Sequence, residues 1–195
     1  MTILSARRLG TVQRPTPGAY ATRGGTYGVG QFGHSWDGWT LGMQSGWSDP
    51  GQTLTPQGFL LPGNNSYAWR DDHRPVQRIQ LQMQASVLGD LFFGCDATGA
   101  GMMFRIDTRP SSPTGFAATS SWTAWNSPVS GPTAVANRWY DVTVDLGTTE
   151  ARATVVGPSS HSVITTAYTA QGSAIGLQGD GGGGQTVYRN LTVYV

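Results

Sequence analysis

Lysine is absent from this 195-residue chain, and glutamate occurs once, at Glu150. All twelve basic residues are Arg, and ten of the eleven acidic residues are Asp. Lys and Glu are the usual residues of exposed helix faces, whereas the Gly, Thr, Ser, Val and Trp that are plentiful here favour strands and turns. The composition therefore predicts an all-β chain, and its length suits one β-sandwich domain.

Charge is also scarce, at 12% of residues with a formal net charge of +1. Binding to nucleic acid normally needs clustered Lys and Arg, so we expect no nucleic-acid partner. No apolar run of about 20 residues could span a membrane, and the N-terminus lacks the apolar run of about 7 to 15 residues of a secretory signal peptide. We expect no membrane partner and an extracellular or virion-associated location that is reached without a signal peptide.

Metal-binding and redox motifs are missing too. Cys95 is the single cysteine, which excludes a disulfide framework and a Cys-based metal site and favours a buried, inert thiol. The three histidines, His34, His73 and His161, lack the spacing of zinc ligands. No cofactor is expected. Calcium is considered only for AWRDDHRP, residues 68–75, where a solvated turn is the other interpretation because adjacent side chains on an extended segment point to opposite faces.

Residues 1–30 differ from the rest of the chain. The run RRLGTVQRPTPGAYATRGGTYGVGQ is rich in Pro, Gly and Arg and has no lasting period, which predicts an extended N-terminal arm followed by one domain over residues 31–195. We expect the arm to lie along a neighbouring subunit, with its own domain as the alternative. A homo-oligomer or a larger assembly is therefore the expected partner of the arm.

Alternating apolar and polar residues recur between turn signals over most of residues 78–195, as in half-buried strands. The closing segment, residues 185–195, is expected to pair with SAIGLQ through a GDGGGG hairpin loop. On the strand GMMFRIDTR the polar face carries Met103, Arg105, Asp107 and Arg109. The positions expected to face the core are Ile79, Leu81, Met83, Ala85, Met102, Phe104, Ile106, Tyr140, Val142, Val144, Leu146, Val187, Leu191, Val193 and Val195.

Several of these segments resemble, in order, a known family. They are GWSDPGQTLTPQGFLLPG, FFGCDATGAGMMFRIDTR, NRWYDVTVDLG followed by ARATVVG, and SAIGLQGDGGGGQTVYRNLTVYV. Residues 33–195 thus resemble the concanavalin A-like lectin/glucanase superfamily, and most of all its laminin G-like and keto-disaccharide-hydrolase-like jelly rolls. The resemblance implies a jelly-roll β-sandwich of two antiparallel sheets, with a concave face or rim loops that commonly bind glycans.

Tryptophans supply the candidate sugar platforms. In domains of this type a pair spaced like Trp39 and Trp47 closes the sandwich, so the resemblance implies a packing role for both. Trp122 and Trp125 instead lie in the polar segment SSWTAWN, where an exposed ring can stack on the apolar face of a pyranose. The alternative is that these two rings pack on the sandwich.

The polar partners of such a sugar are sought among charged residues near these rings. We expect Arg105, Asp107 and His73 to supply hydrogen bonds to the hydroxyls of the sugar. For Arg105 and Asp107, a network of ion pairs across neighbouring strands is the structural alternative.

Enzymatic motifs are absent. Retaining glycosidases need two carboxylates about 5 Å apart, and the E-x-D-x-x-E strand motif of laminarinase-like relatives is missing; a serine triad has no G-x-S-x-G motif to start from. The sequence therefore predicts a non-catalytic module for carbohydrate binding or adhesion. It suits a structural or host-recognition subunit of a phage tail or virion whose partner is a glycan or cell-surface polysaccharide. The alternative is a carbohydrate-active lyase or hydrolase on the same fold.

Overall fold

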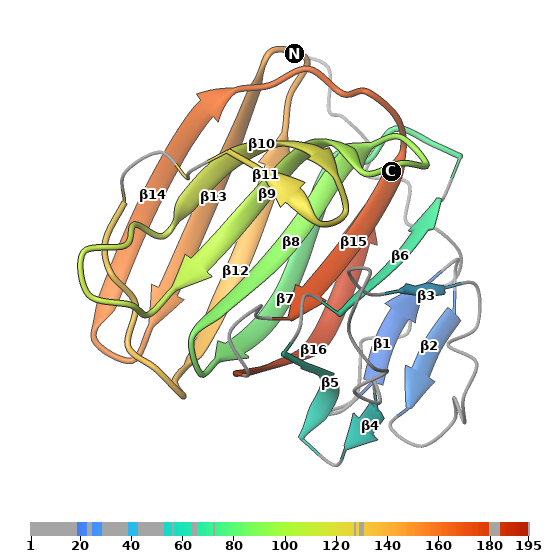
Figure 1. Ribbon diagram of the computed structural model, residues 1–195. Coiled ribbons are helices and arrows are strands. Elements are labelled where there is room, and N and C mark those ends of the chain that lie inside the picture. The colour runs from blue at the N-terminus through green and yellow to red at the C-terminus, as the bar shows by residue number, and fades with distance from the viewer. Residues whose placement is uncertain are drawn as a thin grey trace, which may run out of the picture.

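The protein is a β-sandwich of two seven-stranded antiparallel sheets (Figure 1). The structure, a computed structural model, describes residues 19–22, 25–28, 39–42, 53–55, 57–63, 66–71, 73–126, 128, 131–179 and 184–194. Every regular element in these ranges is a strand, as the lack of Lys and Glu predicted. Within the same ranges, no helix is long and apolar enough to cross a membrane.

The two sheets are named here by their strand order. Sheet I consists of β11 (Ala124–Trp125), β10 (Gly115–Ser121), β9 (Ala100–Asp107), β8 (Leu88–Cys95), β15 (Ala174–Gly179), β6 (Tyr67–Asp71) and β3 (Thr40–Gly42). Sheet II consists of β14 (Ser160–Ala167), β13 (Glu150–Gly157), β12 (Trp139–Leu146), β7 (Arg78–Ala85), β16 (Gln185–Tyr194), β5 (Gly58–Pro62) and β4 (Thr53–Thr55).

The core lies between the inner faces of the two sheets and follows the alternation that the sequence predicted for three strands. On β7, β9 and β12 the predicted apolar set faces the core; all of it is buried except Met102 and Leu146, which are half-buried and pack against the core. Cross-strand pairing holds the register, for example Val142 opposite Leu81 and Val144 opposite Ile79. Trp39 also packs against this cluster, with its ring centroid 6.3 Å from that of Phe59. Its expected packing role is confirmed, whereas Trp47 lies outside the described residues.

The expected hairpin between SAIGLQ and the last strand is wrong. SAIGLQ belongs to β15 in the middle of sheet I, between β8 and β6, whereas β16 lies in sheet II between β7 and β5. The glycine-rich segment therefore connects the two sheets. A run of glycines signals a change of chain direction, but it does not distinguish a hairpin within one sheet from a crossing between sheets.

The expected burial of Val187 is also wrong. Thr186 and Tyr188 are fully buried, and Val187 points to the outer face. The pairing of β16 with β7 shifts between Arg189 and Thr192, and Asn190 has a φ of 57°. This bulge reverses the alternation of inward and outward side chains along β16, so that Leu191 and Val193 face the core as predicted. Strict alternation along the whole strand cannot bury Tyr188 and Leu191 together. Val195 lies outside the described residues.

Part of the predicted N-terminal arm forms a small hairpin. Strands β1 (Ala19–Thr22) and β2 (Gly25–Gly28) pair with each other, and β1 lies close to β16 of the same chain (Figure 1). This arrangement is the alternative in which the arm contacts its own domain. The prediction that the arm reaches a neighbouring subunit stays a prediction, since the structure describes a single chain and residues 1–18 lie outside the described ranges.

Candidate functional site

The outer face of sheet I, which points away from sheet II, carries a cluster of aromatic and charged side chains. Pairing places Gln178 opposite both Tyr67 and Asp90, and Asp90 opposite Arg105. Directly paired residues point to the same face, so these four side chains form one row across β6, β15, β8 and β9. The adjacent row consists of Trp69, Gly176, Phe92 and Met103.

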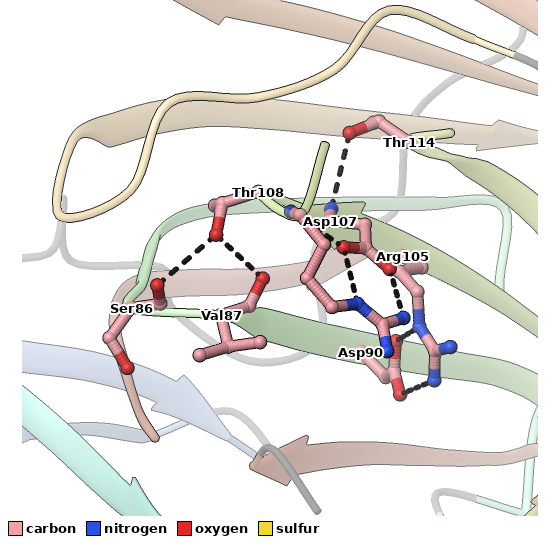
Figure 2. A network of polar contacts seen from close by, with 8 residues as sticks. Ser86, Val87, Asp90, Arg105, Asp107, Thr108 and Thr114 are labelled. Carbon is pink, nitrogen blue, oxygen red and sulfur yellow. Dashed lines mark hydrogen bonds and ion pairs between the residues drawn. The ribbon is translucent and has the colours of Figure 1, made fainter. Parts of the chain in front are cut away.

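An ion pair at the centre of this face is almost completely removed from water. The Arg105 side chain is 4% exposed and the Asp90 side chain 0% exposed. Arg105 donates twice to the carboxylate, from Nε to Oδ1 at 2.7 Å and from Nη2 to Oδ2 at 2.6 Å (Figure 2). Burial lowers the pKa of Arg105, but the Asp90 charge outweighs it and leaves that pKa above its ordinary value. The Arg105 guanidinium is therefore held in place in its charged form.

A second arginine–aspartate pair lies beside the first. Asp107, two residues after Arg105 on β9, is buried and accepts hydrogen bonds from the backbone N–H of Arg109, from its Nε and from its Nη2. The Arg109 side chain is 50% exposed. Asp107 is thus buried and held in place, while half of the Arg109 side-chain surface is exposed to solvent.

Trp125 is the ring that covers the buried ion pair. The Arg105 Cζ lies 4.7 Å from the centroid of the Trp125 ring, in the position of a cation–π contact. Trp125 comes from β11, the two-residue edge strand that pairs with β10, and it is half-buried. The structure therefore brings together three of the predicted site residues, Arg105, Asp107 and Trp125, on one face.

Trp122 is not the exposed platform that its polar sequence setting suggested. It is 5% exposed and donates from Nε1 to the Ala97 carbonyl at 3.2 Å. Its ring lies over Gly176, where an added Cβ would come within 2.6 Å of a ring carbon. The ring also contacts Phe92 edge-on. Trp122 accordingly packs onto the sheet, which was the alternative interpretation.

Two aromatic residues that sequence reasoning missed complete the cluster. The rings of Trp69 and Tyr67 are stacked against Trp122 at centroid distances of 5.3 Å and 6.2 Å, and both residues are half-buried. Tyr67 precedes the charged run AWRDDHRP and Trp69 lies within it. Both alternate in YAWRD with the inward-facing Ala68 and Arg70. That alternation was the signal that could have identified them as outward-facing rings.

Gln178 is a buried amide whose hydrogen-bonding capacity is unused. It is 0% exposed, and neither its Oε1 nor its Nε2 has a hydrogen-bond partner in the part of the chain that the structure describes. A buried amide without partners is costly. It lies between Tyr67 and Asp90 in the row described above, next to the ion pair and beneath the surface of the face.

His73 lies apart from the other candidates. It follows β6, which is separated from β9 by β15 and β8. His73 is exposed, its backbone N–H donates to Asp71 at 2.8 Å, and its Nδ1 lies 3.0 Å from Asp71 Oδ2. With Arg78 and Tyr194 it lines a separate open groove of about 1010 Å³. His73 is therefore not beside Arg105 or Asp107, because β6 and β9 are three strand positions apart in sheet I.

The residues that the structure describes gather no group of potential metal ligands. No three His, Cys, Asp or Glu side chains come together there. Of the residues considered for calcium, Asp72 lies outside the described ranges, and the Asp71 carboxylate accepts from Ser173 at 2.5 Å. On the outer face, the carboxylates of Asp90 and Asp107 are each held by an arginine, so both are poorly placed to exchange a proton with a substrate.

Comparison with known proteins finds likeness in structure only. No family model matches the chain, and no curated protein matches it. Carbohydrate binding module CBM66 from Bacillus subtilis superposes with a TM-score of 0.57 at 17% identity, over 81% of this chain and 96% of that one. The VIP36 exoplasmic/lumenal domain, in a form bound to Ca2+ and Man2, gives 0.55 at 11% identity, over 80% of each chain. These matches confirm that the chain has the concanavalin A-like jelly-roll fold that its sequence motifs resemble.

Proposed function

We propose that this protein is a non-catalytic carbohydrate-binding module that holds a saccharide on the outer face of sheet I, next to Trp125. The observation that carries the proposal is the buried Arg105–Asp90 pair under a tryptophan ring, on a face that points away from the core. A buried ion pair is seldom more stabilising than apolar side chains of similar volume. Its presence here favours a face adapted to a polar ligand over one built for stability alone.

The half-buried aromatic rings and the exposed part of the Arg109 side chain provide the two kinds of contact that a sugar needs. Trp125, Trp69 and Tyr67 retain some exposed surface, and an aromatic ring can pack against the C–H face of a pyranose. The exposed half of Arg109 can donate to ring hydroxyls.

The charge of this face favours an uncharged saccharide. Each arginine is neutralised by a bidentate aspartate, Arg105 by Asp90 and Arg109 by Asp107. A ligand carboxylate or sulfate would have to compete with these aspartates for the same guanidinium donors. The described part of the face therefore offers no surplus positive charge to an acidic sugar.

The fold comparisons support this proposal from a second direction. Among the similar structures, one is described as a carbohydrate binding module and another was determined in a Man2-bound form. Their low identity transfers no residue and no ligand to this chain. They show that jelly rolls of this shape serve sugar binding elsewhere, which is why the outer face of sheet I is tested first.

The experiment is a binding measurement on a panel of uncharged and acidic polysaccharides with the purified full chain and two variants. Trp125→Ala should weaken binding about 5- to 30-fold, since a stacked ring contributes about 1 to 2 kcal/mol. Trp139→Ala is the matched control. Trp139 is also half-buried and stacks on an arginine, Arg189, at 3.7 Å, but it lies on the outer face of sheet II.

Binding of uncharged polysaccharides that is lost in Trp125→Ala and kept in Trp139→Ala supports the proposed site. Binding that depends equally on Trp139 would move the site to sheet II. If no polysaccharide binds, the carbohydrate-binding proposal fails, and a scaffold role becomes the better account. Selective binding of acidic polysaccharides would contradict only the argument from charge.

We also propose that the module acts as a host-recognition subunit of a phage tail or virion, outside the cell. This proposal is supported by the basic, Pro- and Gly-rich composition of residues 1–30, which suits an arm that docks on another subunit. Adsorption of the purified chain to intact cells or to cell-wall polysaccharide tests it. The alternative function, a carbohydrate-active lyase or hydrolase, predicts shortening of the same polysaccharides during incubation.

A further inference from the structure

The outer face of sheet II carries an arginine that is held in place but forms no ion pair with the described residues. Arg189 on β16 follows the buried Tyr188 and pairs with Gln82, whose side chain also points outward. The Arg189 Cζ lies 3.7 Å from the centroid of the Trp139 ring, and its Nε donates to Gln82 Oε1 at 2.7 Å. No carboxylate of the described chain lies within ion-pair distance of this guanidinium.

The two Nη groups of Arg189 are the part of the guanidinium that is left for a ligand. Neither donates to a described residue, and neither is a buried atom without a partner, so both are reached by water. The planar fork of an arginine matches two oxygens of a carboxylate or a phosphate. On the outer face of sheet I this fork is occupied, in Arg105 by Asp90 and in Arg109 by Asp107. Arg189 therefore offers an anion the donors that those two arginines have already used.

A hydrogen-bond network and a bulge fix the position of Arg189. The pairing of β16 with β7 shifts directly after it, and Asn190 has a φ of 57°, which is uncommon for a residue other than glycine. Asn190 Nδ2 donates to Gln82 Oε1 at 2.9 Å, and Gln82 Nε2 donates to Asp141 Oδ1 at 2.6 Å. The acidic residue of this row, Asp141, thus contacts Gln82 and not Arg189. Bulges often re-aim a side chain next to a functional site.

A small polar hollow adjoins Trp139 on the same face. Gln84 is paired with Trp139 on one side and with Val187 on the other, and this row lies next to the row of Arg189. The hollow has a volume of about 270 Å³ and is lined by Gln84, Ser86, Asn137, Gly184, Gln185 and Val187. Amide and hydroxyl groups of this kind form hydrogen bonds with the hydroxyls of a sugar.

We propose that the outer face of sheet II binds an acidic saccharide, with its carboxylate or phosphate on the Arg189 fork and its hydroxyls in the hollow beside Trp139. Arg189 is half-buried, and partly buried charges are screened less by water and salt than exposed ones. A ligand anion therefore gains more here than at an exposed arginine. The site lies on the opposite side of the sandwich from the proposed site for uncharged sugars and does not depend on it.

The first test measures the affinity of the full chain for an oligogalacturonate, for its methyl ester and for a poly(glycerol phosphate). The oligogalacturonate should bind, and its ester should bind much more weakly, because the ester keeps the sugar and loses the charge. Added salt should weaken the binding. Binding of the oligogalacturonate identifies a carboxylate as the anion, and binding of the poly(glycerol phosphate) alone identifies a phosphate. If neither binds, the proposal is overturned.

The second test changes Arg189 itself. Arg189→Gln should weaken binding of the acidic ligand about 10- to 100-fold, the usual range for hydrogen bonds to a charged group. Arg189→Lys should restore only part of this loss, because an ammonium keeps the charge without the planar fork. The matched control is Arg152→Gln, at an exposed arginine on the outer face of the same sheet, and it should bind like wild type. Thermal melting followed by circular dichroism checks that all three variants are folded.

Two tryptophan variants separate this site from the one on sheet I. Trp139→Ala removes the ring that holds Arg189 and should weaken binding of the acidic ligand, whereas Trp125→Ala should leave that binding unchanged. Acidic binding that depends on Trp125 would place the anion on sheet I. An equal loss in Arg152→Gln and Arg189→Gln would indicate attraction to positive charge in general. Either result would overturn the proposal, and neither bears on the binding of uncharged polysaccharides.

Discussion

At the scale of single residues, the Arg105–Asp90 pair has the largest expected effect on stability. Asp90→Ala would leave the Arg105 guanidinium 4% exposed and without its bidentate partner. Removing one member of a buried ion pair costs about 3 to 5 kcal/mol, because the remaining charge stays buried. Urea denaturation of wild type and variant measures this loss in the free energy of unfolding.

The control for that experiment removes both charges. Asp90→Leu combined with Arg105→Met keeps the face filled with side chains of similar size and leaves no unpaired ion. The double variant should recover most of the lost stability, since the pair itself contributes little net free energy. A single Asp90→Ala variant that loses less than about 1 kcal/mol would show that water reaches the guanidinium.

The burial of Trp122 changes what its substitution should do. Its sequence setting between Ser, Thr and Asn suggested an exposed ring, but the partners that bury it, Tyr67, Trp69 and Gly176, come from distant strands. We expect Trp122→Ala to destabilise the fold by about 3 to 5 kcal/mol, as for other buried tryptophans. Thermal melting measures it. A variant that melts like wild type would restore the interpretation of Trp122 as an exposed platform.

At the scale of elements, the alternation of strand β12 makes a prediction that depends on register alone. Val144 is 0% exposed and faces the core, whereas Asp145 points outward and meets Arg78 at 2.5 Å on the surface. Val144→Asp should cost several kcal/mol, because it buries an unpaired charge. Asp145→Asn should cost less than about 1 kcal/mol. Chemical denaturation compares them, and a reversed order would mean a register shifted by one residue.

The strands show which parts of the fold could be predicted from the sequence. Strands β7, β9 and β12 have one face in the core and long unbroken alternation, so their inward residues were predicted correctly. Strand β15 is buried on both faces, so its sequence does not alternate between apolar and polar residues and does not indicate the sheet to which it belongs. In β16, a bulge at Asn190 reverses the phase. The local sequence pattern predicts that a strand forms, but it predicts neither the sheet to which the strand belongs nor a bulge within the strand.

The candidate site could be predicted in part, because alternation along a strand was again the usable signal. Arg105 and Asp107 were placed on the outer face of β9 because alternation fixes which side chains share a face. Their roles depend on Asp90 and Trp125 from other strands, and cross-strand neighbours are set by topology. Asp90, Gln178, Tyr67 and Trp69 were missed because no motif links residues that only strand pairing brings together.

At the scale of the whole molecule, three buried acids make stability sensitive to alkaline pH. Burial raises the pKa of Cys95 from 9.0 to about 12 and that of Tyr168 from 10.0 to about 12, and it raises the pKa of Tyr188 well above 10.0. In the unfolded chain these groups ionise at their ordinary pKa values. Their contribution to stability is therefore complete below about pH 9 and is lost progressively toward pH 12.

The expected result is a melting temperature that falls steadily above about pH 9, with each ionising group removing up to about 1.4 kcal/mol per pH unit. Cys95→Ala should make the first part of this fall shallower, because Cys95 has the lowest ordinary pKa of the three. Calorimetry or circular dichroism between pH 7 and 11 measures the curve. An unchanged melting temperature across that range would mean that these groups are open to water in the folded state.

The N-terminal arm is the part of the molecule whose role the single chain does not decide. No buried residue of the described core cluster precedes Phe59, although β1 lies beside β16. Deleting residues 1–30 should therefore leave a cooperatively melting domain and weaken its assembly with other subunits. Calorimetry and sedimentation of the truncated and full chains test both halves of this expectation. A truncated chain that loses its cooperative transition would show that the arm, through β1 beside β16, belongs to the folding unit.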